Sequence, residues 1–149
     1  MNGRHGMEIP WSTPAAARVP SGQDIVILGS RFELTTAWRS PAFLGYALRI
    51  WLQARRSPGI MGVSLRAQPL RATFWTLSAW SSQAALRDFA RADPHRSIVA
   101  RVRPWAKTAV LQTWTVPAGE ADPATPGPTA LDPAALWEQA EARISSASR

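Results

Sequence analysis

The sequence predicts an α+β fold in which a four-stranded antiparallel sheet carries two helices on one face. Segments rich in β-branched and aromatic residues alternate with segments of helical periodicity, in the order strand, helix, strand, strand, helix, strand. Only the short link AQPLR separates the second strand from the third, which predicts a hairpin. The 149 residues are enough for one domain with an adequate core. This order is typical of the ferredoxin-like split β-α-β fold.

Two patterns define the first strand and the first helix. The run DIVILGSRFEL, which begins at Asp24, is first β-branched and apolar and then begins to alternate, which predicts a strand that is buried on both faces at one end. Ser40 and Pro41 are a cap and a first-turn residue, and Pro58 and Gly59 end the helix. Its apolar stripe is Phe43, Ala47, Ile50, Trp51 and Ala54. Its polar face carries Arg49, Gln53 and Arg56.

A hairpin and a second helical region complete the predicted core. The segments GIMGVSLRA and ATFWTLSAW predict the second and third strands, and the third alternates almost perfectly. One of its faces carries Phe74, Thr76, Ser78 and Trp80, and the other carries Trp75, Leu77 and Ala79. Ser81 or Ser82 caps a helix that breaks and restarts at Pro94, and KTAVLQTWTV predicts the fourth strand.

The third strand therefore bears large apolar side chains on both faces. Two helices can cover only one face of the sheet, and an exposed apolar patch of that size is typical of an interface. We therefore expect a homodimer built through the sheets.

The ends of the chain differ from the core in composition. We expect residues 1–22 to form a flexible arm, 23–116 the folded domain, 117–130 a linker and 131–149 a C-terminal helix and tail. Four prolines and two glycines in the linker favour an extended chain. The helix begins at Asp132 and Pro133 and could dock on its own subunit or on the partner. Its apolar residues are Leu136, Trp137, Ala140 and Ile144.

Composition and charge exclude several kinds of function. The absence of cysteine excludes disulfides, thiolate zinc sites and cysteine nucleophiles. No zinc pattern, phosphate loop or carboxylate pair occurs, so we expect no metal site. There is neither a signal peptide nor an apolar run of about 18 residues, which predicts a cytoplasmic protein without a membrane partner.

The net charge of +7 is concentrated in the folded middle of the chain. Thirteen basic and three acidic residues lie between Arg31 and Lys107. Such a field attracts anions, including carboxylates and nucleic acid. A nucleic-acid partner is disfavoured, because single-strand binders expose their sheet aromatics, whereas we expect these to be buried.

The stretch ARADPHRSIVARVRPW, residues 90–105, holds the only histidine within a patterned segment. Steps of three, four and seven from His95 reach Ile98, Val99 and Val102, and the next turn brings Trp105. His95 therefore heads an apolar stripe. Two interpretations are open: a hydrogen-bonded core histidine, or a base or ligand that lines a pocket.

Eight tryptophans in so short a chain raise a similar choice. They are most simply core residues, and the alternative is a flat aromatic cavity for a polycyclic substrate. The substrate-binding candidates are Trp75, Trp80, Trp105, Tyr46 and Arg49.

The segment TFWTLSAWSSQAALRDFARADPHRSIVARVRPW resembles the dimeric α/β-barrel superfamily, specifically antibiotic biosynthesis monooxygenase-like domains. A weaker similarity, over PGIMGVSLRAQPLRATFWTLSAW, is to spheroidene monooxygenase, a haem-binding family. Together they cover about residues 24–116. The resemblance implies a dimeric α/β barrel with a pocket between the sheet and the helices of each subunit. In the haem-handling branches a histidine of the second helical region binds iron, and His95 lies near that place. Those branches also use an asparagine, and the only one here is Asn2.

The resemblance implies a monooxygenase of secondary metabolism that acts on a small aromatic or polyketide-like phenolic molecule. An oxygenase without a cofactor needs a substrate that passes an electron to O₂ once it is deprotonated, together with a base, a dry pocket and an oxyanion donor. We assign the catalytic role to His95 and expect no cofactor, with haem as the alternative. Two other functions stay open: a haem-binding oxygenase or dehydratase-type member of the superfamily, and a non-catalytic dimeric binding module.

Overall fold

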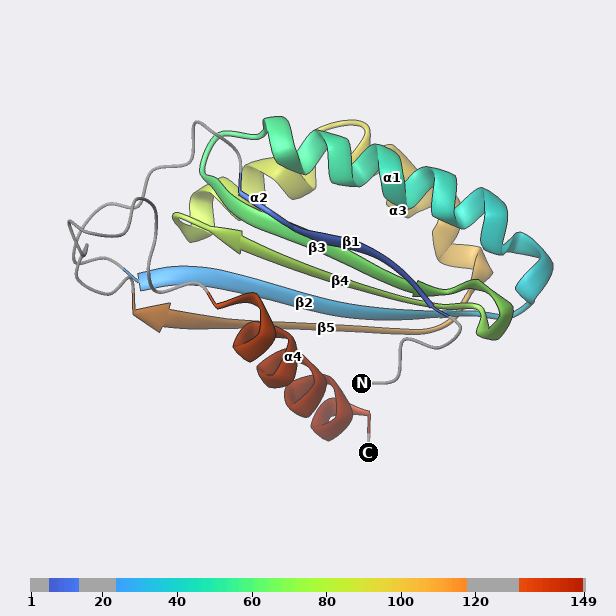
Figure 1. Ribbon diagram of the computed structural model, residues 1–149. Coiled ribbons are helices and arrows are strands. Elements are labelled where there is room, and N and C mark those ends of the chain that lie inside the picture. The colour runs from blue at the N-terminus through green and yellow to red at the C-terminus, as the bar shows by residue number, and fades with distance from the viewer. Residues whose placement is uncertain (1–5, 14–23, 118–131, 149) are drawn as a thin grey trace.

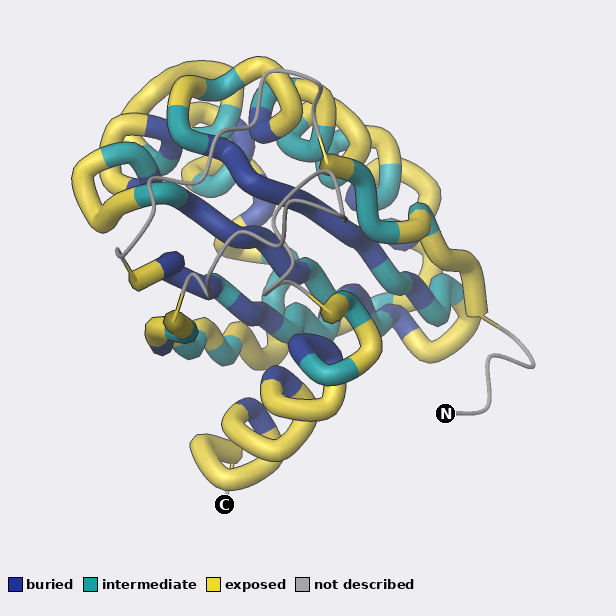
Figure 2. The backbone as a smooth tube through the Cα atoms, turned by 60° about the vertical axis from the view of Figure 1, so that its left-hand side comes forward, coloured by how far each residue is buried: buried dark blue, intermediate teal, exposed yellow. Residues whose placement is uncertain are grey.

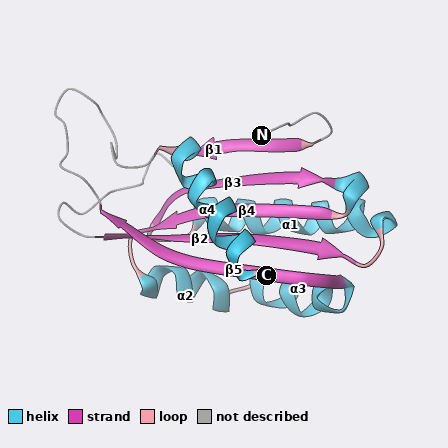
Figure 3. Ribbon diagram, turned by 90° about the horizontal axis from the view of Figure 1, so that it is seen from below, coloured by secondary structure: helices cyan, strands magenta, loops and turns pink. Residues whose placement is uncertain are grey.

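The computed structural model describes residues 6–13, 24–117 and 132–148 and has one antiparallel sheet at its centre. The strands follow the order β1-β3-β4-β2-β5 (Figure 3). Their bounds are β1 (Met7–Ser12), β2 (Asp24–Leu34), β3 (Ile60–Gln68), β4 (Thr73–Trp80) and β5 (Ala106–Pro117). On one face lie α1 (Ser40–Arg56), α2 (Gln83–Arg91) and α3 (His95–Val102), and on the other lies α4 (Pro133–Ala147) (Figure 1). Three short 3₁₀ helices, η1 (Ala37–Arg39), η2 (Pro69–Arg71) and η3 (Arg103–Trp105), join these elements.

The predicted α+β fold is confirmed. The strands β2, β3, β4 and β5, with α1 between the first two and α2 and α3 before the last, follow the ferredoxin-like order. Two predicted caps are confirmed: Ser82 Oγ accepts from the N–H of Ala85 at 3.1 Å, and Asp132 Oδ1 accepts from that of Ala134 at 3.1 Å. The predicted cap at Ser40 is wrong, because Arg39 is the residue that precedes α1 and the Ser40 hydroxyl donates to the Pro69 carbonyl at 2.7 Å. No helix of the described residues is long and apolar enough to cross a membrane.

The fifth strand, β1, was not expected, and the prediction of a flexible arm is wrong for residues 7–12. This segment pairs antiparallel with β3 at the edge of the sheet, where the missing N–H of Pro10 is tolerated. Trp11 packs on Gly62, where a Cβ atom would lie only 2.0 Å from the indole ring. Residues 1–5 and 14–22 of the expected arm, and 118–130 of the expected linker, lie outside the described residues.

Helix α4 covers the outer face of the sheet, which we define as the face opposite α1–α3. A buried cluster joins the helix to the strands: Ile25, Ile27, Met61, Leu77, Ala79, Trp114, Leu136, Trp137 and Ala140. The helix comes close to the sheet at Gly29, where an added Cβ would lie 3.2 Å from the Cβ of Ala140. The apolar face that predicted a homodimer is therefore covered by the same chain.

The inner face of the sheet packs against α1, α2 and α3. Two buried clusters fill this layer, one around Trp80 and Phe89 and the other around Phe43 and Phe74. Figure 2 shows that the buried residues run mainly along the strands, whereas the helices are largely exposed on their outer sides. The inner layer is not completely filled, and the space that is left is the candidate site.

Candidate functional site

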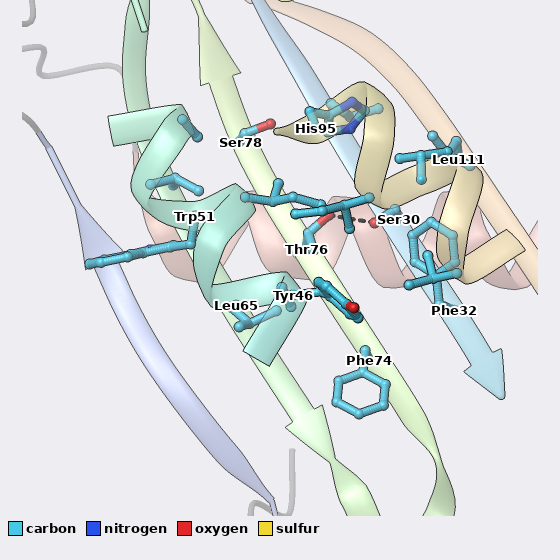
Figure 4. A pocket seen from close by; sticks show the side chains of 18 of the residues that line it. Ser30, Phe32, Tyr46, Trp51, Leu65, Phe74, Thr76, Ser78, His95 and Leu111 are labelled. Carbon is cyan, nitrogen blue, oxygen red and sulfur yellow. Dashed lines mark hydrogen bonds between the residues drawn. The ribbon is translucent and has the colours of Figure 1, made fainter. Parts of the chain in front are cut away.

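A cavity of about 310 Å³ lies between the inner face of the sheet and the helices α1 and α3. The floor comes from alternate residues of β2 and β4, which face inward because side chains alternate along a strand. Floor residues include Ser30, Phe32, Phe74, Thr76, Ser78 and Trp80. The walls include Tyr46, Ile50 and Trp51 from α1, His95, Ile98 and Val99 from α3, and Leu111 from β5. The cavity is therefore mainly apolar, with a few polar groups at defined places (Figure 4).

The backbone around His95 is held from two sides. The N–H of His95 donates to Gln53 Oε1 at 2.7 Å, and Gln53 Nε2 donates to the carbonyls of Phe89 at 3.2 Å and Ala92 at 3.4 Å. Asp93 Oδ1 accepts from the N–H and the hydroxyl of Ser97, as a capping carboxylate does. The break between α2 and α3 is thus fixed against α1, and this fixes the position of the histidine.

The imidazole ring of His95 lines the cavity and has a defined tautomer. Its Nδ1 atom lies 3.0 Å from the carbonyl oxygen of Ala90, and since a carbonyl can only accept, Nδ1 carries the hydrogen. Burial lowers the pKa of His95 below 6.5, an effect opposed in part by the bond to Ala90. The ring is therefore neutral at pH 7, and its lone pair is on Nε2. The Phe89 ring packs against it, with centroids 4.8 Å apart.

Three hydroxyl groups form a polar strip across the apolar floor. Trp80 Nε1 donates to Ser78 Oγ at 2.9 Å. Ser30 Oγ and Thr76 Oγ1, which are opposite each other in the pairing of β2 with β4, are hydrogen-bonded to each other. We refer to Ser30, Thr76 and Ser78 as the hydroxyl strip.

Of the five predicted substrate-binding residues, the structure places Trp80 and Tyr46 at this cavity. Trp80 is fully buried, and the Tyr46 hydroxyl accepts from Arg101 Nη1 at 2.9 Å. Trp105 and Arg49 do not line the cavity. Trp105 packs on the Tyr46 ring at 5.9 Å between centroids, and the exposed Arg49 lies 5.7 Å from the same ring. These two residues support Tyr46 from outside.

Trp75 lies on the outer face, as the alternation of its strand predicts, and it does not line the cavity that holds Trp80. Side chains alternate between the two faces of a strand, so residues an odd number of positions apart point to opposite faces. Trp75 and Trp80 are five positions apart and therefore lie on opposite faces. Trp75 lines a second cavity of about 460 Å³ between the sheet and α4. Arg31, Arg66 and Trp137 also line it, and the Arg66 guanidinium lies 4.1 Å from the Trp137 ring centroid.

Sequence reasoning missed Trp51 and Gln53 as site residues. Trp51 was placed correctly on the apolar stripe of its helix, but only the structure shows that this part of the stripe lines the cavity. Gln53 was assigned to the polar face, because the periodicity of α1 does not reveal that the break between α2 and α3 packs beside it. The hydroxyl strip had a visible signal, namely three hydroxyl residues on the otherwise apolar inner faces of two strands.

The side chains around the cavity decide whether the site can hold a metal ion or haem. Within the described ranges no group of three or more His, Asp or Glu side chains is arranged to hold a metal ion. His95 Nε2 is the nitrogen that would bind haem iron, because Nδ1 carries the hydrogen. However, a volume of about 310 Å³ is at the small end for ligand pockets and leaves no room for a tetrapyrrole with its propionates. The site as arranged is too small for haem.

Comparison with known proteins supports the fold. No family model and no curated protein matches the chain. SnoaB, described as a cofactor-independent oxygenase from Streptomyces nogalater, matches with a TM-score of 0.54 and 19% identity, over 68% of this chain and 99% of SnoaB. Protein SO0527 from Shewanella oneidensis matches with a TM-score of 0.57 and 13% identity, over 72% of this chain and 97% of its own. Rv0793 from Mycobacterium tuberculosis matches with a TM-score of 0.57 and 15% identity, over 66% of this chain and 99% of Rv0793. The chain therefore has the fold of these solved structures, which is the fold that the resemblance to antibiotic biosynthesis monooxygenase-like domains implies.

Proposed function

We propose that this chain is a monooxygenase that needs no cofactor and acts on a small aromatic phenol bound in the cavity between the sheet and α1–α3. The observation that carries the proposal is the state of His95. Because Nδ1 donates to the carbonyl of Ala90 and burial keeps the ring neutral, Nε2 is free to accept a proton at the edge of an apolar cavity. A phenolic hydroxyl is a suitable donor for that proton near neutral pH.

The shape and lining of the cavity support an aromatic, polyketide-like substrate. Phe32, Phe74 and Trp80 present ring surfaces on the floor, and aromatic ligands pack well on such surfaces. The volume suits a molecule of a few fused rings. The match to SnoaB, which is described as a cofactor-independent oxygenase, supports the same class of reaction.

The proposed reaction balances with O₂ as the only co-substrate. His95 Nε2 takes the phenolic proton, and the phenolate passes one electron to O₂. The two radicals then combine, and a C–O bond forms at a ring carbon that bears hydrogen. His95 returns its proton to the peroxide, the O–O bond breaks, and water leaves with that proton and the hydrogen of the ring carbon. One oxygen atom enters the ring, the other leaves as water, and the phenol becomes a quinone.

The test is oxygen uptake with α-naphthol, a phenol whose para position is free. We expect the purified chain to consume one O₂ for each quinone formed, as followed with an oxygen electrode and by absorbance. His95→Gln should reduce the rate by about a hundredfold or more, the usual contribution of a general base. Binding of α-naphthol without any oxygen uptake would contradict the oxygenase and favour the non-catalytic binding module. A Soret band after addition of haemin, shifted in His95→Gln, would instead favour the haem-binding alternative.

We also infer that the chain functions as a homodimer and in the cytoplasm, in secondary metabolism. The resemblance to dimeric α/β barrels supports the dimer. Since α4 covers the outer face of the sheet, the second copy would have to pack around α4 or exchange this helix with its own. Light scattering after size exclusion should give about twice the chain mass of 16.3 kDa. A monomer at micromolar concentration would contradict the dimer.

A further inference from the structure

Trp80 and Ser78 form a hydrogen bond on the cavity floor in which the hydroxyl hydrogen of Ser78 takes no part. An indole N–H can only donate, so the oxygen of Ser78 must be the acceptor in this bond. The hydroxyl hydrogen of Ser78 is therefore not used in the bond. Among the residues that the structure describes, no acceptor for that hydrogen is hydrogen-bonded to Ser78.

The surroundings of Ser78 make its hydroxyl hydrogen a strong donor for a bound ligand. The residue is 7% exposed, lines the cavity and lies beside the fully buried indole of Trp80. Its strand neighbour on β2 is Leu28, so the nearby floor is apolar. A hydroxyl donor in such a setting is worth more to a ligand than the same donor in water, because water does not compete for it.

Figure 4 shows the Ser78 hydroxyl and the His95 ring at the same end of the cavity, with the serine oxygen on the side toward the histidine. The two groups have complementary roles. Nε2 of His95 can accept a proton, and the Ser78 hydroxyl can donate a hydrogen bond to the oxygen that has lost one. Trp80 fixes the serine oxygen, so the donor is oriented before a ligand arrives.

We propose that Ser78 is the oxyanion donor of this site, oriented by Trp80, and that the cavity selects molecules with an ionisable aromatic hydroxyl over molecules of the same shape without one. The inference rests on the proposed function only for its ligand class, because binding of a phenolate to Ser78 does not require oxygen chemistry.

The simplest structural role for Ser78 is to satisfy the Trp80 N–H. Ser78→Ala removes that acceptor as well as the donor, so this variant by itself does not separate the two roles. The Trp80→Phe background does, because a phenyl ring needs no acceptor. Within that background, Ser78→Ala removes only the donor, and Ser78→Thr retains a hydroxyl.

The probe is para-nitrophenol, whose ionised form absorbs visible light, with nitrobenzene as the matched ligand that lacks the hydroxyl. In the Trp80→Phe background we expect Ser78→Ala to weaken para-nitrophenol binding by about tenfold and to raise the pKa of the bound phenol by about one unit, as loss of a hydrogen bond to a charged group does. Nitrobenzene binding should not change, and Ser78→Thr should restore the phenol values. Ser40→Ala is the control, because this buried serine lies outside the cavity and its hydroxyl donates to the Pro69 carbonyl.

Equal changes for both ligands, or no change for either, would overturn the role of Ser78, and so would a wild-type chain that does not bind para-nitrophenol. These outcomes are separable from failure of the oxygenase. If the wild type discriminates between the two ligands through Ser78 but consumes no O₂, the donor stands and the oxygenase fails. If Ser78→Ala binds both ligands as the wild type does while oxygen uptake continues, the oxygenase stands and the donor fails.

Discussion

The backbone nitrogen of His95 lies 2.7 Å from Oε1 of Gln53, which connects the first residue of α3 to the last turn of α1. The amide nitrogen of the same glutamine contacts the carbonyls of Phe89 and Ala92 at the end of α2. One side chain therefore contacts backbone groups on both sides of the break between the two helices. Within the described residues, Gln53 is the acceptor for the His95 N–H, whereas the Phe89 and Ala92 carbonyls also accept from the N–H groups of Ala92 and Arg96. Gln53 is a positioning residue for His95.

We expect Gln53→Ala to lower both stability and activity. Three hydrogen bonds to backbone groups are lost, which should cost about 1–3 kcal/mol in the free energy of unfolding measured by urea denaturation. Displacement of the His95 ring should reduce kcat by up to about a hundredfold, with a smaller change in KM. Gln53→Glu retains an acceptor for the His95 N–H and should recover part of kcat. An exposed residue of the same helix, changed as Arg56→Ala, is the control. Unchanged kinetics in Gln53→Ala would show that His95 does not need this contact.

The lowered pKa of His95 predicts a pH dependence with a definite sign. In the folded protein burial disfavours the protonated ring, so between the folded value and the unfolded value of about 6.5 the unfolded chain binds more protons. The difference in the free energy of unfolding between the wild type and His95→Gln should therefore be largest above about pH 6.5. It should shrink as the pH falls from 6.5 through the pKa of His95 in the folded protein. The acid limb of kcat/KM should likewise lie below pH 6.5, since the base acts as the neutral ring. A limb at or above 6.5 would contradict a buried neutral histidine.

Two glycines provide a matched test of how closely α4 approaches the sheet. Gly29→Ala would place a Cβ 3.2 Å from the Cβ of Ala140 and 3.3 Å from the Trp114 ring, so α4 would have to shift. We expect a loss of about 1–3 kcal/mol in the free energy of unfolding. Gly45 is an exposed residue of α1, and a Cβ added there has no atom within 4 Å. Gly45→Ala should therefore raise the free energy of unfolding by about 0.5–1 kcal/mol. Equal effects for the two substitutions would contradict the close contact at Gly29.

Removal of residues 118–149 should expose the outer face of the sheet. Leu136 and Trp137 are 3% and 4% exposed, and the strand residues Ile27 and Leu77 beneath the helix are fully buried. We expect the shortened chain to bind an apolar dye and to associate further in light scattering, because an exposed apolar patch of this kind is unstable in water. A shortened chain with an unchanged assembly state and no dye binding would show that α4 is only an appendage.

The fold was predictable from sequence because its signals are local. Alternation and β-branched runs placed β2, β3, β4 and β5, and Asp132 with Pro133 placed the start of α4. β1 was missed because MEIPWS is short, contains a proline and is stabilised mainly by tertiary contacts such as that of Trp11 with Gly62.

The site was only partly predictable, for a different reason. The alternation of β4 does separate Trp75 from Trp80, but which of the two faces holds a cavity depends on how completely α1, α3 and α4 fill their sides. Periodicity alone does not report that. The roles of Gln53 and of the Ala90 carbonyl depend on the mutual packing of three helices, so no pattern within one segment indicates them.

The most direct test of the proposed function compares the activity of His95→Ala with its stability. We predict that oxygen uptake with α-naphthol falls by about a hundredfold or more, because the base is lost. The melting temperature, followed by circular dichroism, should change by only a few degrees. A variant that melts clearly lower but oxidises the phenol at the wild-type rate would show that His95 is a structural residue, and would contradict the account.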